Sequence, residues 1–257
     1  MSQGTISSDG LFYWDGAQWQ PTRSPDGMWR WTGSAWVASS DASVTLQSVS
    51  GYSSARWIGV WLSVLLGVSV AMALIAFLGE LYFNLTLTLA GRDIVYSIDV
   101  GGLFIFAITS TVFLVWFGLS YRNLSFLGAR DLLFTPGRAV GWWFVPVACW
   151  WKPYAAVVEI WQASDPTAPA TTSAPSRRGA DSVPLLPFWW VTWIISLVLV
   201  NAASLLIYPA DTQQWLLNMS AAATAVAGVL AMVVVLSISN RQDARWRRLV
   251  SQTSASA

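Results

Sequence analysis

The densest group of polar side chains in the chain lies between residues 122 and 159, flanked by apolar stretches on both sides. Arginine and lysine donate charge-assisted hydrogen bonds to carboxylates and phosphates, so this group could grip anionic lipid headgroups or hold a buried carboxylate. We take it as a candidate interaction or structural site, with a substrate or lipid pocket beneath the nearby tryptophans as the functional alternative. Its members are Arg122, Asn123, Arg130, Arg138, Lys152 and Glu159.

The residue types argue against catalysis. The chain contains no histidine, which removes His-based triads and the commonest ligand of zinc and haem. Its single cysteine, Cys149, is interpreted as a packing residue, and the sequence has no glycine-rich phosphate loop. We therefore expect a protein that is not an enzyme, with no catalytic, cofactor-binding or metal-binding residues and no cofactor.

The composition indicates a membrane protein. The chain of 257 residues is 55% hydrophobic and 11% charged, whereas a soluble domain carries about 25% charged residues. The net charge of +1 argues against a nucleic-acid partner. Crossing a bilayer takes about 20 apolar residues in a helix. We expect an all-α integral membrane bundle in a domain of residues 56–240, with four transmembrane helices at about residues 57–79, 103–121, 187–207 and 214–239.

The connecting segments have different characters. Residues 136–164 are rich in tryptophan, but Pro146, Lys152 and Pro153 prevent a simple span, so we expect broken helices at the membrane interface. Residues 81–102 should form an external loop. Residues 163–182 are rich in Pro, Ala, Ser and Thr and are predicted to be a disordered loop, and residues 241–257 a basic tail.

Charge predicts the orientation. With the N-terminus, residues 121–182 and the C-terminal tail inside, Arg92 is the only basic residue outside. The predicted location is the cytoplasmic membrane of a bacterium, as a multi-pass protein with both termini cytoplasmic. The bacterial source is suggested by abundant alanine and by arginine greatly outnumbering lysine.

The N-terminal residues 1–38 contain a repeat, in which residues 9–19 match residues 26–36. Asp15-Gly16 favours a tight turn, so we expect a module of two small β-hairpins, followed by a linker at residues 39–55. A self-packed mini-domain is the simpler interpretation. The alternative is an aromatic platform for an extended or Pro-rich peptide, made by Trp14, Trp19, Trp29, Trp31 and Trp36.

The region between the second and third spans carries a specific pattern. Its elements are Tyr121-Arg122-Asn123-Leu124, Gly128-Ala129-Arg130, Gly141-Trp142-Trp143-Phe144-Val145-Pro146, Lys152-Pro153-Tyr154 and Glu159-Ile160-Trp161. This pattern resembles the domain-of-unknown-function 4328 family over about residues 57–240. The resemblance implies a bacterial four-span membrane protein with no established activity. Leu119 and Cys149 depart from the pattern, where arginine and asparagine are expected, which would remove part of any function that those polar residues share.

The carboxylate of Glu159 needs a partner. Residues 154–164 place Ala155, Val158 and Trp161 on one apolar stripe with Glu159 beside it, and an unpaired buried charge is costly. Arg122, whose fork can grip a carboxylate, is the predicted partner, and Lys152 is the second choice.

These observations favour a protein that acts by interaction at the cytoplasmic face. Its expected partners are membrane lipids and a cytoplasmic protein bound through the N-terminal repeats. A small-molecule or lipid transporter or channel is the alternative, although no span carries the mid-membrane charge typical of an ion path. An enzyme acting on lipid headgroups is the third hypothesis, and it lacks a visible acid, base or nucleophile.

Overall fold

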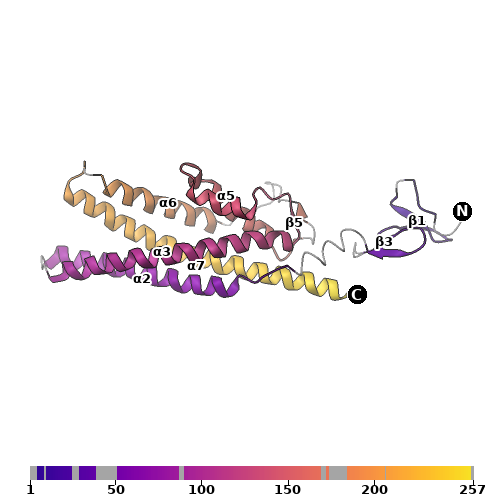
Figure 1. The fold of residues 1–257 in the computed structure, drawn as a ribbon, viewed down its shortest axis with the longest axis horizontal. Helices are drawn as coiled ribbons and strands as arrows, with labels where there is room; N and C mark the ends of the chain where they lie inside the picture. The colour runs from indigo at the N-terminus through magenta and orange to yellow at the C-terminus, as the bar shows by residue number, and fades with distance from the viewer. Residues whose placement is uncertain are drawn as a thin grey trace.

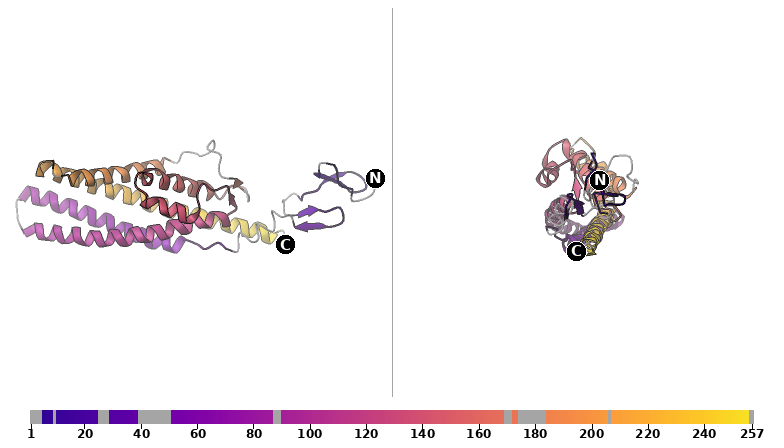
Figure 2. Two further views of the ribbon diagram at one scale, coloured as in Figure 1. Left: turned by 45° about the horizontal axis from the view of Figure 1, so that its top comes forward. Right: turned by 90° about the vertical axis from the view of Figure 1, so that its right-hand side faces the viewer.

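Four long helices make up most of the structure. The computed structural model describes residues 5–8, 10–24, 29–38, 51–86, 90–168, 172–173, 184–205 and 207–255. The long helices are α2 (Arg56–Thr86), α3 (Ala90–Phe126), α6 (Leu185–Ala203) and α7 (Ala210–Ala255). They run alongside one another in Figures 1 and 2, and each contains a stretch long and apolar enough to cross a membrane. The predicted four-span helical architecture is confirmed.

Three helices, α2, α3 and α7, are longer than the sequence suggested, whereas α6 ends at Ala203, before the predicted end of the third span at residue 207. The expected external loop at residues 81–102 is largely helical, since α2 continues to Thr86 and α3 already begins at Ala90. At the other end, α7 passes without a break through the expected tail to Ala255. Neither extension contains proline, and an unbroken helix satisfies its own backbone hydrogen bonds.

Small residues let the spans approach closely. A Cβ atom added to Gly59 on α2 would lie 2.7 Å from the hydroxyl of Ser239 on α7, and one added to Gly228 would lie 2.6 Å from a methyl of Val70. Trp116 of α3 joins the contact between Gly59 and Ser239, because its indole nitrogen donates a hydrogen bond of 3.0 Å to the Ser239 hydroxyl. We call this end of the bundle, where α2 begins and α3 ends, the base.

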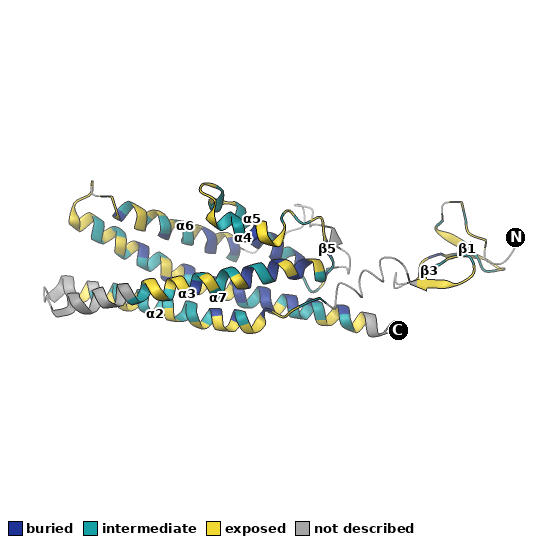
Figure 3. Cartoon of the chain, viewed as in Figure 1, coloured by how far each residue is buried: buried dark blue, intermediate teal, exposed yellow. Residues whose placement is uncertain are grey.

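The segment between α3 and α6 is a chain of short helices, as predicted. It comprises α4 (Pro136–Gly141), the 3₁₀ turns η1 (Trp142–Phe144) and η2 (Ala148–Trp150), and α5 (Lys152–Ala163). Thr135 caps α4, whose first residue is proline. The break between the two turns falls at Pro146 and at Val147, which has a φ of 67°. Figure 3 shows buried residues gathered where these helices meet α3 and α7.

Two β-hairpins form the N-terminal module, as predicted. Strands β1 (Phe12–Trp14) and β2 (Trp19–Pro21) pair antiparallel, and so do β3 (Trp29–Trp31) and β4 (Trp36–Ala38). Gly16 and Gly33 in the turns have φ values of 107° and 99°, which glycine adopts without strain.

Two predicted segments are described only in part. Residues 39–50 of the expected linker lie outside the described residues, and so do residues 169–171 and 174–182 of the loop expected to be disordered. Within that loop, β6 (Thr172–Ser173) pairs in parallel with β5 (Ala129–Arg130).

Candidate functional site

Glu159 is the centre of a buried polar cluster at the base of the bundle. Its side chain on α5 is 4% exposed. The hydroxyl of Tyr121 on α3 donates a hydrogen bond to one carboxylate oxygen, and the backbone N–H of Leu133 donates to the other over 2.7 Å. The Tyr121 hydroxyl in turn accepts from the N–H of Phe134 at 3.0 Å. One carboxylate therefore ties together α3, α5 and the loop between β5 and α4.

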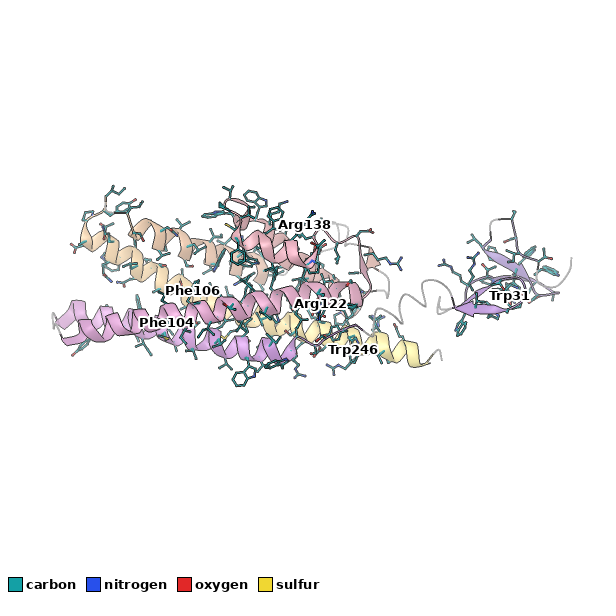
Figure 4. All side chains as sticks on the ribbon, viewed as in Figure 1. Trp31, Phe104, Phe106, Arg122, Arg138 and Trp246 are labelled. Atoms are coloured by element: carbon teal, nitrogen blue, oxygen red, sulfur yellow. The ribbon has the colours of Figure 1, made fainter. Side chains whose placement is uncertain are left out.

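Glu159 does not form the predicted ion pair with Arg122. Arg122 is exposed, because successive residues on an α-helix project about 100° apart and it is Tyr121 that faces α5. Figure 4 labels Arg122 on α3. Lys152, the second choice, lies with its ammonium 5.7 Å from the ring centres of both Phe134 and Trp142, a cation–π geometry.

The buried face of α5 also differs from the predicted stripe. Ala155, Val158 and Trp161 are only half-buried, whereas the fully buried positions are shifted by about one residue. This rotation puts Glu159 within the buried face rather than beside it, which explains why its carboxylate needs two donors. The buried residues are Pro153, Ala156, Val157, Glu159, Ile160 and Ala163.

The six residues of the predicted polar set do not form one site. Asn123 is fully buried in a second network at the base, where its amide donates to the carbonyl of Ser53 at 2.8 Å. Arg122, Arg130 and Arg138 are exposed, and Figure 4 shows Arg138 on α4, away from α7. The structure thus separates two buried anchors, Glu159 and Asn123, from a group of surface cations.

The second network centres on the part of α7 that was expected to be a tail. Gln242 is fully buried and donates to the carbonyl of Ser120 at 2.9 Å. Arg245 is 1% exposed and donates to the carbonyls of Leu127 at 3.0 Å and Asp165 at 3.1 Å. These buried side chains fasten α7 to the ends of α3 and α5. Their spacing of three residues on an uninterrupted helix was the signal that could have revealed them.

Asp165 receives several of these contacts directly after α5. Its carboxylate lies 3.9 Å from Arg241 and accepts hydrogen bonds of 2.8 Å from the backbone and hydroxyl of Thr167. Burial by itself would raise the pKa of Asp165, but these hydrogen bonds and the charges of Arg241 and Arg245 outweigh it, so the pKa lies below its ordinary value. Arg241 also lies 4.6 Å from the ring centre of Trp161.

The last residues of the predicted linker are bound to the base. The hydroxyls of Tyr52 and Ser54 donate to the same oxygen of Asp243, at 2.6 and 2.8 Å, and the Tyr52 ring stacks on Trp246 with centres 5.4 Å apart. Burial raises the pKa of Tyr52, and the hydrogen bond and negative charge of Asp243 add to that shift. The chain from the N-terminal module therefore enters the helices at a fixed point.

Among the tryptophans of residues 142–151, Trp143 packs against the bundle, whereas Trp150 and Trp151 are 46% and 51% exposed. Trp143 lies 5.2 Å from Phe113 and 5.6 Å from Trp193, measured between ring centres. Trp190 of α6 donates an indole hydrogen bond of 3.0 Å to the carbonyl of Trp150. Aromatic rings thus occupy the space between α3, α6 and the broken helices, in edge-to-face or tilted contacts that stabilise both.

The aromatic residues of the N-terminal module both pack together and face outward. Tyr13 of the first hairpin contacts Trp31 and Trp36 of the second, with ring centres 5.1 and 5.9 Å apart, so the two hairpins share one small core. Trp14 is half-buried against Trp19. Trp19, Trp29 and Trp36 remain 41%, 38% and 40% exposed. The module therefore packs like the predicted mini-domain, and it also exposes rings of the kind that the predicted aromatic platform would need.

One comparison with known proteins identifies a family. The family model Domain of unknown function (DUF4328) matches residues 84–240, which is more than half of the chain. The chain belongs to the DUF4328 family. The matched region begins after most of α2, later than the resemblance suggested, and it contains Tyr121, Asn123 and Glu159. No curated protein and no solved structure matched the chain.

Proposed function

We propose that this protein is a membrane-anchored interaction protein, whose four helices hold the tryptophan-rich double hairpin beside the cytoplasmic face for a protein partner. The observation that carries the proposal is the exposure of Trp19, Trp29 and Trp36 on a folded module. Partly exposed aromatic rings are typical anchors of protein interfaces, because these side chains lose little conformational entropy when a partner binds.

The attachment of the module supports the same conclusion. Residues 39–50 can span at most about 40 Å, and residues 52–54 are hydrogen-bonded to Asn123 and Asp243 at the base. A partner bound to the hairpins would therefore stay close to the membrane. The cytoplasmic placement rests on the arginines of α4 and of the last part of α7, which lie at the base.

A transport function receives less support from the buried polar groups. Asn123 and Gln242 lie at the base rather than midway along the spans, and both are hydrogen-bonded to neighbouring segments. Groups committed in this way stabilise the helix ends, and they do not mark a substrate path.

Site-specific photocrosslinking in cells tests the proposal. A photoreactive residue at Trp29 should yield a recurrent protein adduct, and the double change Trp19→Ala and Trp36→Ala should abolish it. The same probe at Trp215, an exposed tryptophan of α7 remote from the module in sequence, is the matched control. If position 29 gives no protein adduct, or gives the same adducts as position 215, the proposal is wrong.

A further inference from the structure

An open groove lies where α2 begins, against the last part of α7. It has a volume of about 570 Å³ and is lined by Ser54, Arg56, Trp57, Val60 and Trp61 together with Asp243 of α7. A smaller hollow of about 210 Å³ shares Ser54 and Asp243 and adds Tyr52, Trp246 and Arg247. Figure 4 labels Trp246, which marks this region of α7. Asp243 is thus common to two adjoining hollows, each of which also holds an arginine.

The charged groups of the two hollows have hydrogen-bonding capacity left. Both hydroxyls that reach Asp243 donate to the same oxygen, so its second carboxylate oxygen accepts no hydrogen bond from the described residues. Arg56 is exposed, and within the described chain its guanidinium has no hydrogen-bond or ion-pair partner. Among the described residues, Arg247 donates only through Nε, to a backbone carbonyl one turn earlier in α7. The groove therefore offers one acceptor and one cation to a ligand of both charges, and the adjoining hollow adds a second cation, Arg247.

The position of the groove, at the start of the apolar stretch of α2, indicates what kind of molecule would meet these charges. Arg56 is the first residue of the apolar stretch of α2, and Trp57 and Trp61 are 66% and 59% exposed. Tryptophan side chains prefer the level of the lipid headgroups. Val64 and Val68, 51% and 40% exposed, continue the same face of α2 by one and two further turns. An apolar path for acyl chains thus leads away from a charged groove.

We propose that this groove binds the headgroup of a zwitterionic phospholipid that carries a primary ammonium. Its phosphate would accept from Arg56, with Arg247 adding positive charge, and its ammonium would donate to the free oxygen of Asp243. The acyl chains would lie along Trp57, Trp61 and Val64. A quaternary ammonium has no N–H to donate, and a glycerol headgroup has no cation, so both should bind more weakly. The site shares no residue with the aromatic surface of the N-terminal module.

Native mass spectrometry of the full chain in detergent tests the proposal with three lipids of identical acyl chains. Phosphatidylethanolamine should be retained about tenfold more than phosphatidylcholine or phosphatidylglycerol, the effect of one good charged hydrogen bond. Asp243→Asn should erase the preference for phosphatidylethanolamine over phosphatidylcholine. Arg56→Gln should lower the retention of all three lipids. Arg122→Gln, which removes another exposed arginine near the end of α3, is the matched control and should change nothing.

Further variants separate binding from structural damage. Tyr52→Phe removes one of the two hydroxyls anchored on Asp243 but keeps the charge, so the lipid preference should persist. The variant with alanine replacing Trp19, Trp29 and Trp36 should also keep it, which distinguishes this site from the proposed partner surface. Equal retention of the three lipids, or a loss of preference in Tyr52→Phe as large as in Asp243→Asn, would overturn the proposal. Displacement by soluble phosphoethanolamine at millimolar concentration would show a free ligand instead of a lipid and would overturn it too.

Discussion

Tyr121 donates its hydroxyl hydrogen bond to the buried carboxylate of Glu159 and so joins α3 to α5. The same hydroxyl accepts from the backbone of Phe134, and the second oxygen of Glu159 accepts from the backbone of Leu133. Two side chains thereby satisfy two backbone N–H groups in a loop that has no regular structure at those positions. The contact fixes how the broken helices sit against the bundle.

The Tyr121–Glu159 contact should be a main source of stability for the broken helices. Tyr121→Phe should cost about 1–3 kcal/mol, because it leaves both the Glu159 carboxylate and the Phe134 N–H short of a partner. Glu159→Ala should cost at least as much, and the double variant clearly less than the sum. Thermal unfolding in detergent measures these effects.

Arg122→Ala is the control for that cycle, because Arg122 is exposed on the helical turn next to Tyr121. It should change the free energy of unfolding by no more than about 0.5 kcal/mol. Strictly additive losses for Tyr121 and Glu159, or coupling of Glu159 to Arg122 instead, would contradict the hydrogen-bonded arrangement.

Arg245 should be the most sensitive basic residue of α7. Arg245→Met keeps most of the apolar volume but removes the donors to the carbonyls of Leu127 and Asp165. Leaving buried carbonyls unpaired costs about 1–3 kcal/mol each, so the melting temperature should fall markedly. Arg247→Gln, at an exposed position on the same helix, should have little effect. Equal effects of the two changes would show that Arg245 is not buried in solution.

The large features of the fold could be predicted because each follows from a local rule. A run of about 20 apolar residues has few alternatives to a membrane-spanning helix, since its backbone hydrogen bonds must be satisfied internally. The Asp15-Gly16 turn and the repeated tryptophans likewise predict hairpins, and Trp14 pairs with Trp19 across the first one. Pro146 and Pro153 mark where the central helices break.

The contacts of the base depend on rotations that the sequence does not encode locally. A rotation of α3 by one residue, about 100°, decides whether Tyr121 or Arg122 faces Glu159. The cluster of arginines after Asn240 resembles a solvated tail in composition, yet Arg245 is buried because α7 continues and lies against α3 and the end of α5. Composition alone therefore does not show which charges of such a helix are buried.

The orientation can be tested with single cysteines. In a Cys149→Ser background, an impermeant thiol reagent applied to intact cells should label a cysteine at Asp211 but not one at Ser251. Both positions are exposed and lie near opposite ends of α7. The expectation follows from the arginines gathered toward the Ser251 end. Labelling at Ser251 and not at Asp211 would invert the topology and place the N-terminal module outside the cytoplasm.

Acidification should weaken the attachment of the loop that follows α5. The pKa of Asp165 lies below its ordinary value of 3.8 in the folded protein. Its ionised carboxylate therefore contributes stability above that value, and the contribution is lost as the pH falls through the lower folded pKa. Because the side chain is 41% exposed, the gain over Asp165→Asn should be at most about 1 kcal/mol. Melting temperatures of the two proteins should differ by a constant amount down to about pH 4 and converge below it. A difference that grows on acidification, or Asp165→Asn being the more stable protein at neutral pH, would contradict the role of Arg241 and Arg245 in holding this carboxylate.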